Sequence, residues 1–207
     1  GPWLWELMDT PTPQTLRIKG PRPWVDITHP HYGVRLGTGQ SASVRSRNRA
    51  AVQAAIGDAQ TTGGLVLIPG IAEVNANITL SPTEANPLYI VGAGRRRSKV
   101  RFIGNYGFRI AQNSVGLHMK GLSIDTDQAK FTATAAVQST RNSIYLEFSD
   151  LAFEEGFDRG LDLVSTYQVD VDLCAFYSGR GMVMHTPSGW ETSPQYTVSR
   201  CQFNPSN

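Results

Sequence analysis

The pattern of apolar and polar positions repeats along the second half of the chain. Four stretches, LHMKGLSI, LEFSDLAF, VDVDLCAF and YTVSRCQF, carry apolar residues at the same four positions. Within each stretch apolar and polar residues alternate, the phase slips by one residue before the third apolar position, and alternation resumes. Alternation is typical of β-strands, and a bend between two strands explains the slip. Each stretch therefore predicts two short strands joined by a bend.

Aligning the four stretches gives four columns of equivalent residues. The columns are Leu117, Leu146, Val169 and Tyr196; Met119, Phe148, Val171 and Val198; Leu122, Leu151, Cys174 and Cys201; and Ile124, Phe153, Phe176 and Phe203. The last column recurs after 29, 23 and 27 residues, so the motif keeps its register while the connecting loops vary in length. Gly-led runs at 160–165 and 181–186 add a further strand to each unit.

Several short strands per unit, with no helix between units, predict an all-β chain folded as a parallel β-helix. Stacking then places Cys174 over Cys201, and we expect both to be buried free thiols rather than a disulfide. An antiparallel sandwich is the alternative, because its strands also recur between turns. The sandwich gives no reason for stacked identities.

The first half of the chain contains one helical pattern among strands. Residues 46–62 carry apolar residues mostly at helical spacing, with Ser46 or Asn48 as the predicted N-cap and the pair Gly63 and Gly64 as the stop. Strands are predicted at 65–70, 77–80 and 88–94. Residues 1–23 hold five prolines and three large apolar residues, so they form an arm that docks on the following domain or on a partner chain.

Composition and charge add limits to this picture. The chain has 207 residues, is 40% hydrophobic and contains two cysteines, so it has enough apolar residues for a core and is not a disulfide scaffold. Residues 1–124 carry a net charge of +8 and the remainder −6. The basic clusters at 45–49 and 95–101 could suit nucleic acid or an anionic glycan. Because they lack interleaved aromatic residues, we favour their interpretation as solvated loop charge. No apolar run is long enough to span a membrane.

The order of these features resembles the pectate-lyase-like right-handed parallel β-helix proteins, in particular phage tailspikes and polysaccharide depolymerases. Three stretches carry the resemblance: DITHPHYGV at 26–34, RAAVQAAIGDAQTTGGLVLIPG at 49–70, and LYIVGAGRRRSKVRF at 88–102. They are similar to the opening strand, the entry helix with its Pro-Gly exit, and the first complete coil of that family. Residues 24–207 then correspond to the N-terminal coils of a β-helix, and we expect further coils or another chain beyond Asn207.

The resemblance implies a function that spacing alone does not show. It implies a homotrimeric virion appendage of a phage tail, acting outside the cell, that binds and depolymerises a bacterial surface polysaccharide. The arm at 1–23 would contact other virion tail proteins. Two alternatives stay open: a secreted bacterial polysaccharide lyase or glycoside hydrolase acting as a monomer, and a non-catalytic module that attaches a larger spike to the virion. No cofactor is expected, apart from Ca²⁺ if the protein is a lyase, with Arg159 or Arg180 as its base.

Candidate catalytic residues follow the last apolar column. Asp125 and Glu154 occupy adjacent coils there, with Glu155 beside them, and equivalent residues of stacked strands lie about 4.7–4.9 Å apart. Carboxyl groups about 5–5.5 Å apart suit a retaining glycosidase, and wider pairs suit an inverting one. Alternatively, acidic residues at exposed turns serve only solubility.

Candidate substrate-binding residues lie in the last two units. Tyr177 is next in the same column, and Arg180 immediately precedes the following Gly-led run. His185 and Trp190 lie in the loop sequence MHTPSGWETSPQ, where they would bind sugar by stacking.

Overall fold

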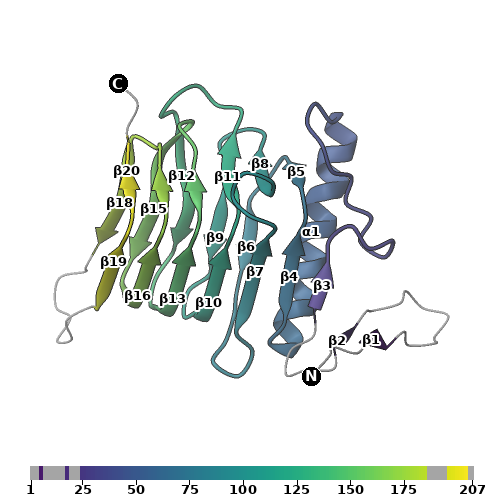
Figure 1. Cartoon of the computed structure of the whole chain (residues 1–207), viewed down its shortest axis with the longest axis horizontal. Helices are drawn as coiled ribbons and strands as arrows, with labels where there is room; N and C mark the ends of the chain where they lie inside the picture. The colour runs from purple at the N-terminus through teal and green to yellow at the C-terminus, as the bar shows by residue number, and fades with distance from the viewer. Residues whose placement is uncertain (1–4, 7–16, 19–23, 186–194, 205–207) are drawn as a thin grey trace.

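The strands of the chain wind into a right-handed parallel β-helix in the computed structural model shown in Figure 1. The structure describes residues 5–6, 17–18, 24–185 and 195–204. Successive strands enter three sheets in turn, called here sheets B, C and D, and five turns place a strand in all three. The predicted all-β fold is confirmed. The antiparallel sandwich is wrong, because strands within these three sheets pair in parallel.

From β4 onward, each sheet collects every third strand of the chain. Sheet B contains β3 (Trp24–Asp26), β4 (Leu65–Ile68), β7 (Leu88–Gly92), β10 (Val115–Lys120), β13 (Ser143–Ser149), β16 (Thr166–Asp172) and β19 (Tyr196–Ser199). Sheet C contains β5 (Ile71–Val74), β8 (Lys99–Phe102), β11 (Ser123–Thr126), β14 (Ala152–Phe153), β17 (Ala175–Phe176) and β20 (Gln202–Phe203). Sheet D contains β6 (Ile78–Leu80), β9 (Phe108–Ile110), β12 (Ala133–Ser139), β15 (Phe157–Val164) and β18 (Arg180–His185). Within residues 1–23, β1 (Trp5–Glu6) and β2 (Arg17–Ile18) form an antiparallel pair.

The strand register matches the columns read from the sequence. Leu117 pairs with Leu146 and Leu146 with Val169 in sheet B, while Ile124 pairs with Phe153 in sheet C. The aromatic end of the last column forms a continuous stack, because the Phe176 ring lies 4.7 Å from Phe153 and 4.8 Å from Phe203 between centroids. The repeat therefore predicted which side chains face the core.

The slip in phase between the two consecutive strands of each stretch is caused by a single residue with left-handed backbone. At this position Gly121 has φ 68°, Asp150 φ 48°, Leu173 φ 55° and Arg200 φ 50°. A left-handed residue turns the chain sharply between extended segments, which carries the strand from sheet B into sheet C. The next residue, such as Leu122 or Leu151, is fully buried and starts the new alternation.

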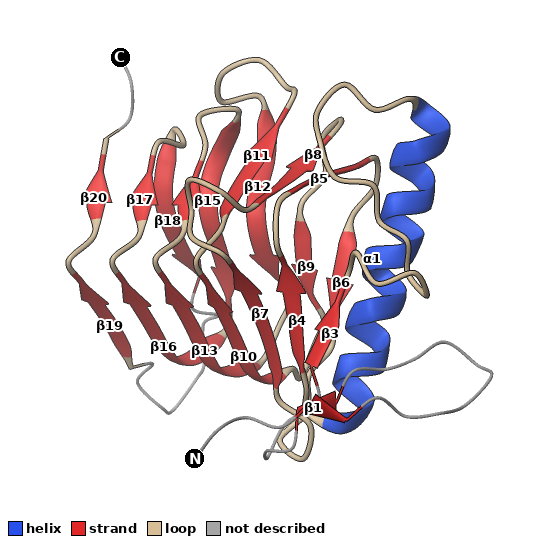
Figure 2. Ribbon diagram, turned by 45° about the vertical axis from the view of Figure 1, so that its right-hand side comes forward, coloured by secondary structure: helices blue, strands red, loops and turns tan. Residues whose placement is uncertain are grey.

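The single helix in the described part, α1 (Ala42–Thr62), lies across the first turn of the solenoid, against β3, β4, β5 and β6 (Figure 2). Its end at Gly63, with φ 65°, was predicted. Its start was predicted wrongly. The N-cap is Ser41, whose side chain accepts a hydrogen bond from the Val44 N–H. The predicted cap Asn48 instead lies buried inside the helix. Among the described residues, no helix combines the length and apolarity needed to cross a membrane.

The core is a column of stacked apolar side chains closed at one end by α1. Val52, Ala55, Ile56 and Ala59 of the helix are completely buried against it. Cys174 is also buried, which raises the pKa of its thiol to about 12. Cys174 and Cys201 are free thiols, as the stacking predicted, but Cys201 in the last described turn is only partly buried.

One buried carboxylate ties α1 to the first coil. Glu73 in β5 is 1% exposed and accepts hydrogen bonds from the N–H groups of Gly39 at 3.0 Å and Gln40 at 2.9 Å. Arg45 Nε lies 3.2 Å from the same carboxylate. Burial alone would raise the pKa of Glu73, but the two backbone donors and Arg45 outweigh it, so the pKa lies below the ordinary range. The charged form therefore stabilises the fold.

We predict that Glu73→Gln lowers the free energy of unfolding by about 1–3 kcal/mol, because it leaves buried donors poorly matched. Since the folded pKa is lowered, the stabilisation is present above the ordinary pKa of about 4.3 and is lost as pH falls through the folded pKa. Urea unfolding from pH 7 to pH 3 should therefore show the gap between wild type and variant narrowing in acid. The exposed Glu84→Gln is the matched control, and a constant gap would contradict the prediction.

Candidate functional site

The outer face of sheet C carries a ladder of charged side chains. Residues Val100, Phe102 and Ile124 point into the core, so their neighbours in β8 and β11 point outward. The register places Glu73 beside Arg101, and Arg101 beside Asp125. Oppositely charged neighbours at cross-strand positions attract one another. The predicted catalytic residue Asp125 therefore lies in a ladder of alternating charge.

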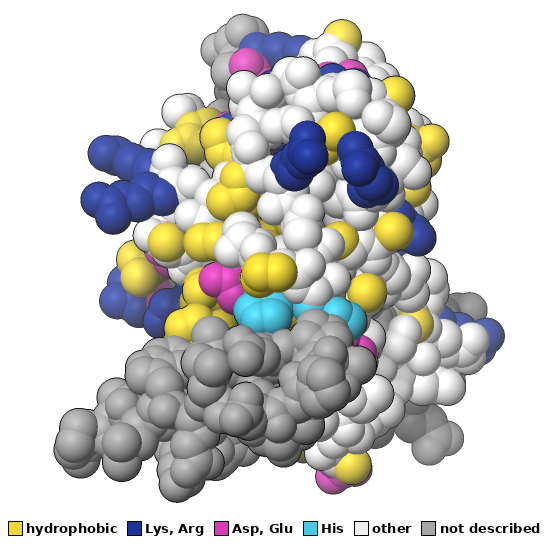
Figure 3. Space-filling view, turned by 90° about the vertical axis from the view of Figure 1, so that its right-hand side faces the viewer, with side chains coloured by type: hydrophobic (Ala, Val, Ile, Leu, Met, Phe, Trp, Pro, Cys, Tyr) yellow, Lys and Arg dark blue, Asp and Glu magenta, His cyan; other side chains and the backbone are white. Residues whose placement is uncertain are grey.

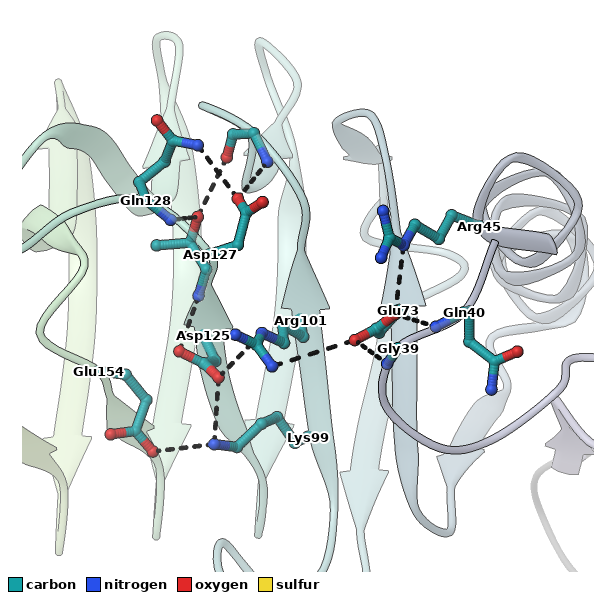
Figure 4. Close-up of polar contacts among 12 residues, drawn as sticks. Gly39, Gln40, Arg45, Glu73, Lys99, Arg101, Asp125, Asp127, Gln128 and Glu154 are labelled. Carbon is teal, nitrogen blue, oxygen red and sulfur yellow. Dashed lines mark hydrogen bonds and ion pairs between the residues drawn. The ribbon is translucent and has the colours of Figure 1, made fainter. Parts of the chain in front are cut away.

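A lysine lies between the two predicted catalytic carboxylates (Figure 4). Lys99 Nζ is 3.2 Å from Asp125 Oδ2 and 3.6 Å from Glu154 Oε1. Arg101 Nε lies 3.6 Å from the same Asp125 oxygen. The structure therefore brings Asp125 and Glu154 together, but within a salt-bridge network rather than as an isolated pair of like charges.

Beside this network lies a groove of about 400 Å³. It is lined by Arg95, Arg96, Lys99, Ser123, Ala152, Glu154 and Tyr177. Ser123 and Ala152 occupy the register position of Lys99 on the next two coils, so small side chains leave the surface hollow there. The Ser123 hydroxyl donates to the Arg95 carbonyl at 2.5 Å, which fixes the basic loop at the rim. We call this hollow the sheet C groove.

The remaining predicted residues lie elsewhere. Glu155 is in the turn after β14, with its side chain 59% exposed and 3.8 Å from Lys130 Nζ. Arg180 and His185 belong to β18 of sheet D. Trp190 lies outside the described residues. The structure therefore places Glu154 and Tyr177 in one groove, links Asp125 to Glu154 through Lys99, and places Arg180 and His185 in sheet D instead of sheet C.

The outer face of sheet D has its own polar cluster, centred on Asp162. This residue is 1% exposed and accepts hydrogen bonds from Arg159 Nη1 at 2.7 Å and Gln138 Nε2 at 2.9 Å. His185 Nε2 lies 3.0 Å from its other oxygen. The buried carboxylate is thus satisfied on both oxygens, and it holds His185 against the sheet.

The two arginines considered as a lyase base are both ion-paired. Arg159 contacts Asp158 and Asp162, and Arg180 contacts Asp158. The hydrogen bond from Arg180 lowers the pKa of Asp158, and the same bond raises the pKa of Arg180 above its ordinary value. To act as a base, the Arg180 guanidinium must first lose its own proton. The raised pKa opposes this loss, so the arrangement offers no support for Arg180 in that role.

The carboxylates that the structure describes do not form a site for a divalent cation. Within the described part of the chain, no group of three or more His, Cys, Asp or Glu side chains is placed to hold a metal ion. Asp125 and Glu154, the nearest candidates, face Lys99 instead. The Ca²⁺ that a lyase would use therefore has no ligand set among the described residues.

Sequence reasoning missed a second hollow surface, on the outer face of sheet B. Two hollows of about 510 and 310 Å³ meet there and share the residues Tyr145, Gln168 and Gln195. Tyr145 and Gln168 immediately precede Leu146 and Val169, which belong to the first aligned column. Extending the alignment by one position toward the N-terminus would have placed Tyr145 and Gln168 in the same column.

No protein-family model, curated protein or solved structure matches this chain. The fold and the two surfaces therefore define the class of the protein, a parallel β-helix with polar grooves on its outer faces.

We predict that Asp125→Asn and Glu154→Gln each lower any polysaccharide cleavage by the chain about a hundredfold or more, the scale of general acid–base catalysis, and leave binding intact. Cleavage is measured as release of reducing ends or of 4,5-unsaturated products. Asp127→Asn is the matched control, because its side-chain oxygen still accepts the Gly104 N–H. Unchanged cleavage in both variants would remove these residues from catalysis.

Proposed function

We propose that this β-helix binds a bacterial surface polysaccharide along the sheet C groove, as part of a phage tailspike. The observation that carries the proposal is the groove itself, which is lined by Arg96 and Lys99 together with Glu154 and Tyr177. An aromatic ring stacks on the apolar face of a sugar ring, while charged side chains bind hydroxyl and acid groups. The groove combines both kinds of contact.

The solenoid suits a long ligand with a repeating structure. Side chains at equivalent positions repeat about every 4.8 Å along its axis, on a face held flat by backbone hydrogen bonds. Rigid side chains lose little entropy on binding. A polysaccharide presents chemical groups at regular intervals, and such a face can contact several of them at once.

The distribution of cations also supports a groove rather than a broad basic surface. Arg45 and Arg101 are used in ion pairs with Glu73 and Asp125. On the face that carries α1, the Lys and Arg side chains are scattered rather than gathered in one patch (Figure 3). Nucleic acid binding depends on many phosphate contacts. The arrangement therefore favours a glycan over nucleic acid.

Binding to a panel of purified bacterial surface polysaccharides tests the proposal. Tyr177→Ala and Lys99→Ala should each weaken binding by about tenfold, since a stacking contact or charged hydrogen bond of about 1.4 kcal/mol corresponds to that factor. Biolayer interferometry on the immobilised glycans measures the change.

Lys120→Ala is the matched control for Lys99→Ala, because Lys120 is an exposed lysine of sheet B outside the groove. Loss of binding in this control would show that bulk charge, not the groove, is responsible. If wild type binds no polysaccharide of the panel, the proposed function is wrong.

We further propose that the protein assembles as a homotrimer and that residues 1–23 attach it to other tail proteins. Apolar residues on a proline-rich arm cannot form a core alone, and they suit docking. Sedimentation velocity should show a trimer, and Trp3→Ala with Trp5→Ala should reduce it to monomer. A monomeric wild type would instead favour the secreted-enzyme alternative.

A further inference from the structure

We propose that the outer face of sheet B holds a second saccharide site, selective for sugars without acidic groups. The inference rests on the proposed function for the class of ligand, a glycan, but it concerns a different face of the solenoid. We call this site the sheet B groove. It consists of the two adjoining hollows that share Tyr145, Gln168 and Gln195.

The groove runs along the solenoid axis rather than along a strand. Its lining includes Val115 of β10, Ile144 of β13 and Tyr167 of β16, and it continues to Thr197 of β19. Four neighbouring strands of a sheet span roughly 14 Å at about 4.8 Å per step. The groove is therefore long enough to contact more than one residue of an extended oligomer.

An aromatic platform lies at its centre. Tyr145 is 52% exposed and has left-handed backbone, with φ 56°. On the next coil Gln168 has the same conformation, with φ 50°. The local backbone therefore places a large ring and an amide side by side at the surface, outside the alternating core pattern. Exposed aromatic rings beside amides are suited to stacking on a sugar and bonding its hydroxyls.

The polar lining is held in place by contacts within the sheet. His118 stacks on Tyr89 with ring centroids 4.3 Å apart and planes 2° apart. Its Nδ1 lies 2.7 Å from Glu147 Oε2. A side chain that is already oriented loses little freedom when a ligand arrives. Glu147 is thus prepared to accept a hydrogen bond from a hydroxyl or amine group.

The charge of the lining decides the class of sugar. Glu84, Glu147 and Asp170 line the two hollows, and no Lys or Arg is among the described residues that do so. A uronate or phosphate group would meet carboxylates there without a compensating arginine or lysine, which is unfavourable. The sheet C groove has the opposite character, with Arg95, Arg96 and Lys99 at its rim. The two faces should therefore select on acidity in opposite directions.

The experiment compares two classes of glycan on one array: neutral and amino-sugar polysaccharides, and uronate-containing polysaccharides. The full chain and the variants Tyr145→Ala, Asp170→Asn and Lys99→Ala are measured by biolayer interferometry. We expect Tyr145→Ala to weaken binding to acid-free glycans about tenfold, with binding to uronate glycans unchanged. Lys99→Ala should show the reverse. Circular dichroism melting checks that each variant is folded, and Asp170→Asn provides a test that keeps side-chain size.

Three outcomes would overturn the inference. The first is that uronate glycans bind and no acid-free glycan does, which leaves the proposed function standing. The second is that acid-free glycans bind equally well to wild type, Tyr145→Ala and Asp170→Asn. The third is a change in sedimentation with Tyr145→Ala, which would show that this face is a contact between copies of the chain. Failure of every glycan to bind would instead remove the proposed function itself.

Discussion

Parallel hydrogen bonding between equivalent strands of successive turns is the constraint on which the rest of the structure depends. Because each strand pairs in register with its counterpart one turn later, a residue facing the core has the core-facing residue of the next turn above it. The ring stack of Phe153, Phe176 and Phe203 follows directly from this register. The same register lines up the outward residues, so chemical groups on the surface also occur in columns.

Stacking also determines how well each turn is buried. Phe176, with a turn on either side, is 1% exposed, whereas Phe203 in the last described turn is 52% exposed although it stacks on Phe176. At the other end, α1 supplies the cover that a neighbouring turn supplies elsewhere. Glu73 has a particular role there, because it joins the loop before the helix to β5 through backbone N–H groups that no strand satisfies.

Much of the fold could be predicted from the sequence, because the alternating pattern and its slip are direct consequences of register. The aligned columns identified the true partners from Leu117 to Phe203. The start of α1 could not be placed from spacing alone, since Ser41, Ser46 and Asn48 are all good caps and only the packing of Asn48 against Arg35 and Glu73 decides between them. The short strand β5 was also missed, because four residues directly after a Pro-Gly turn give little alternation to recognise.

The candidate site was predicted only in part for a related reason. The column of Asp125, Glu154 and Tyr177 was recognised, and Glu154 and Tyr177 both line the sheet C groove. The cations between the carboxylates were not expected, because the alignment began at Leu117 and left out the coil that contains β8. Extending it by one coil pairs Val100 with Ile124, which places Lys99 and Arg101 in the outward columns. Since the three sheets share a core but not a surface, each outer face can change its charge independently of the others. The opposite charges of the grooves on sheets B and C are therefore compatible with one continuous fold.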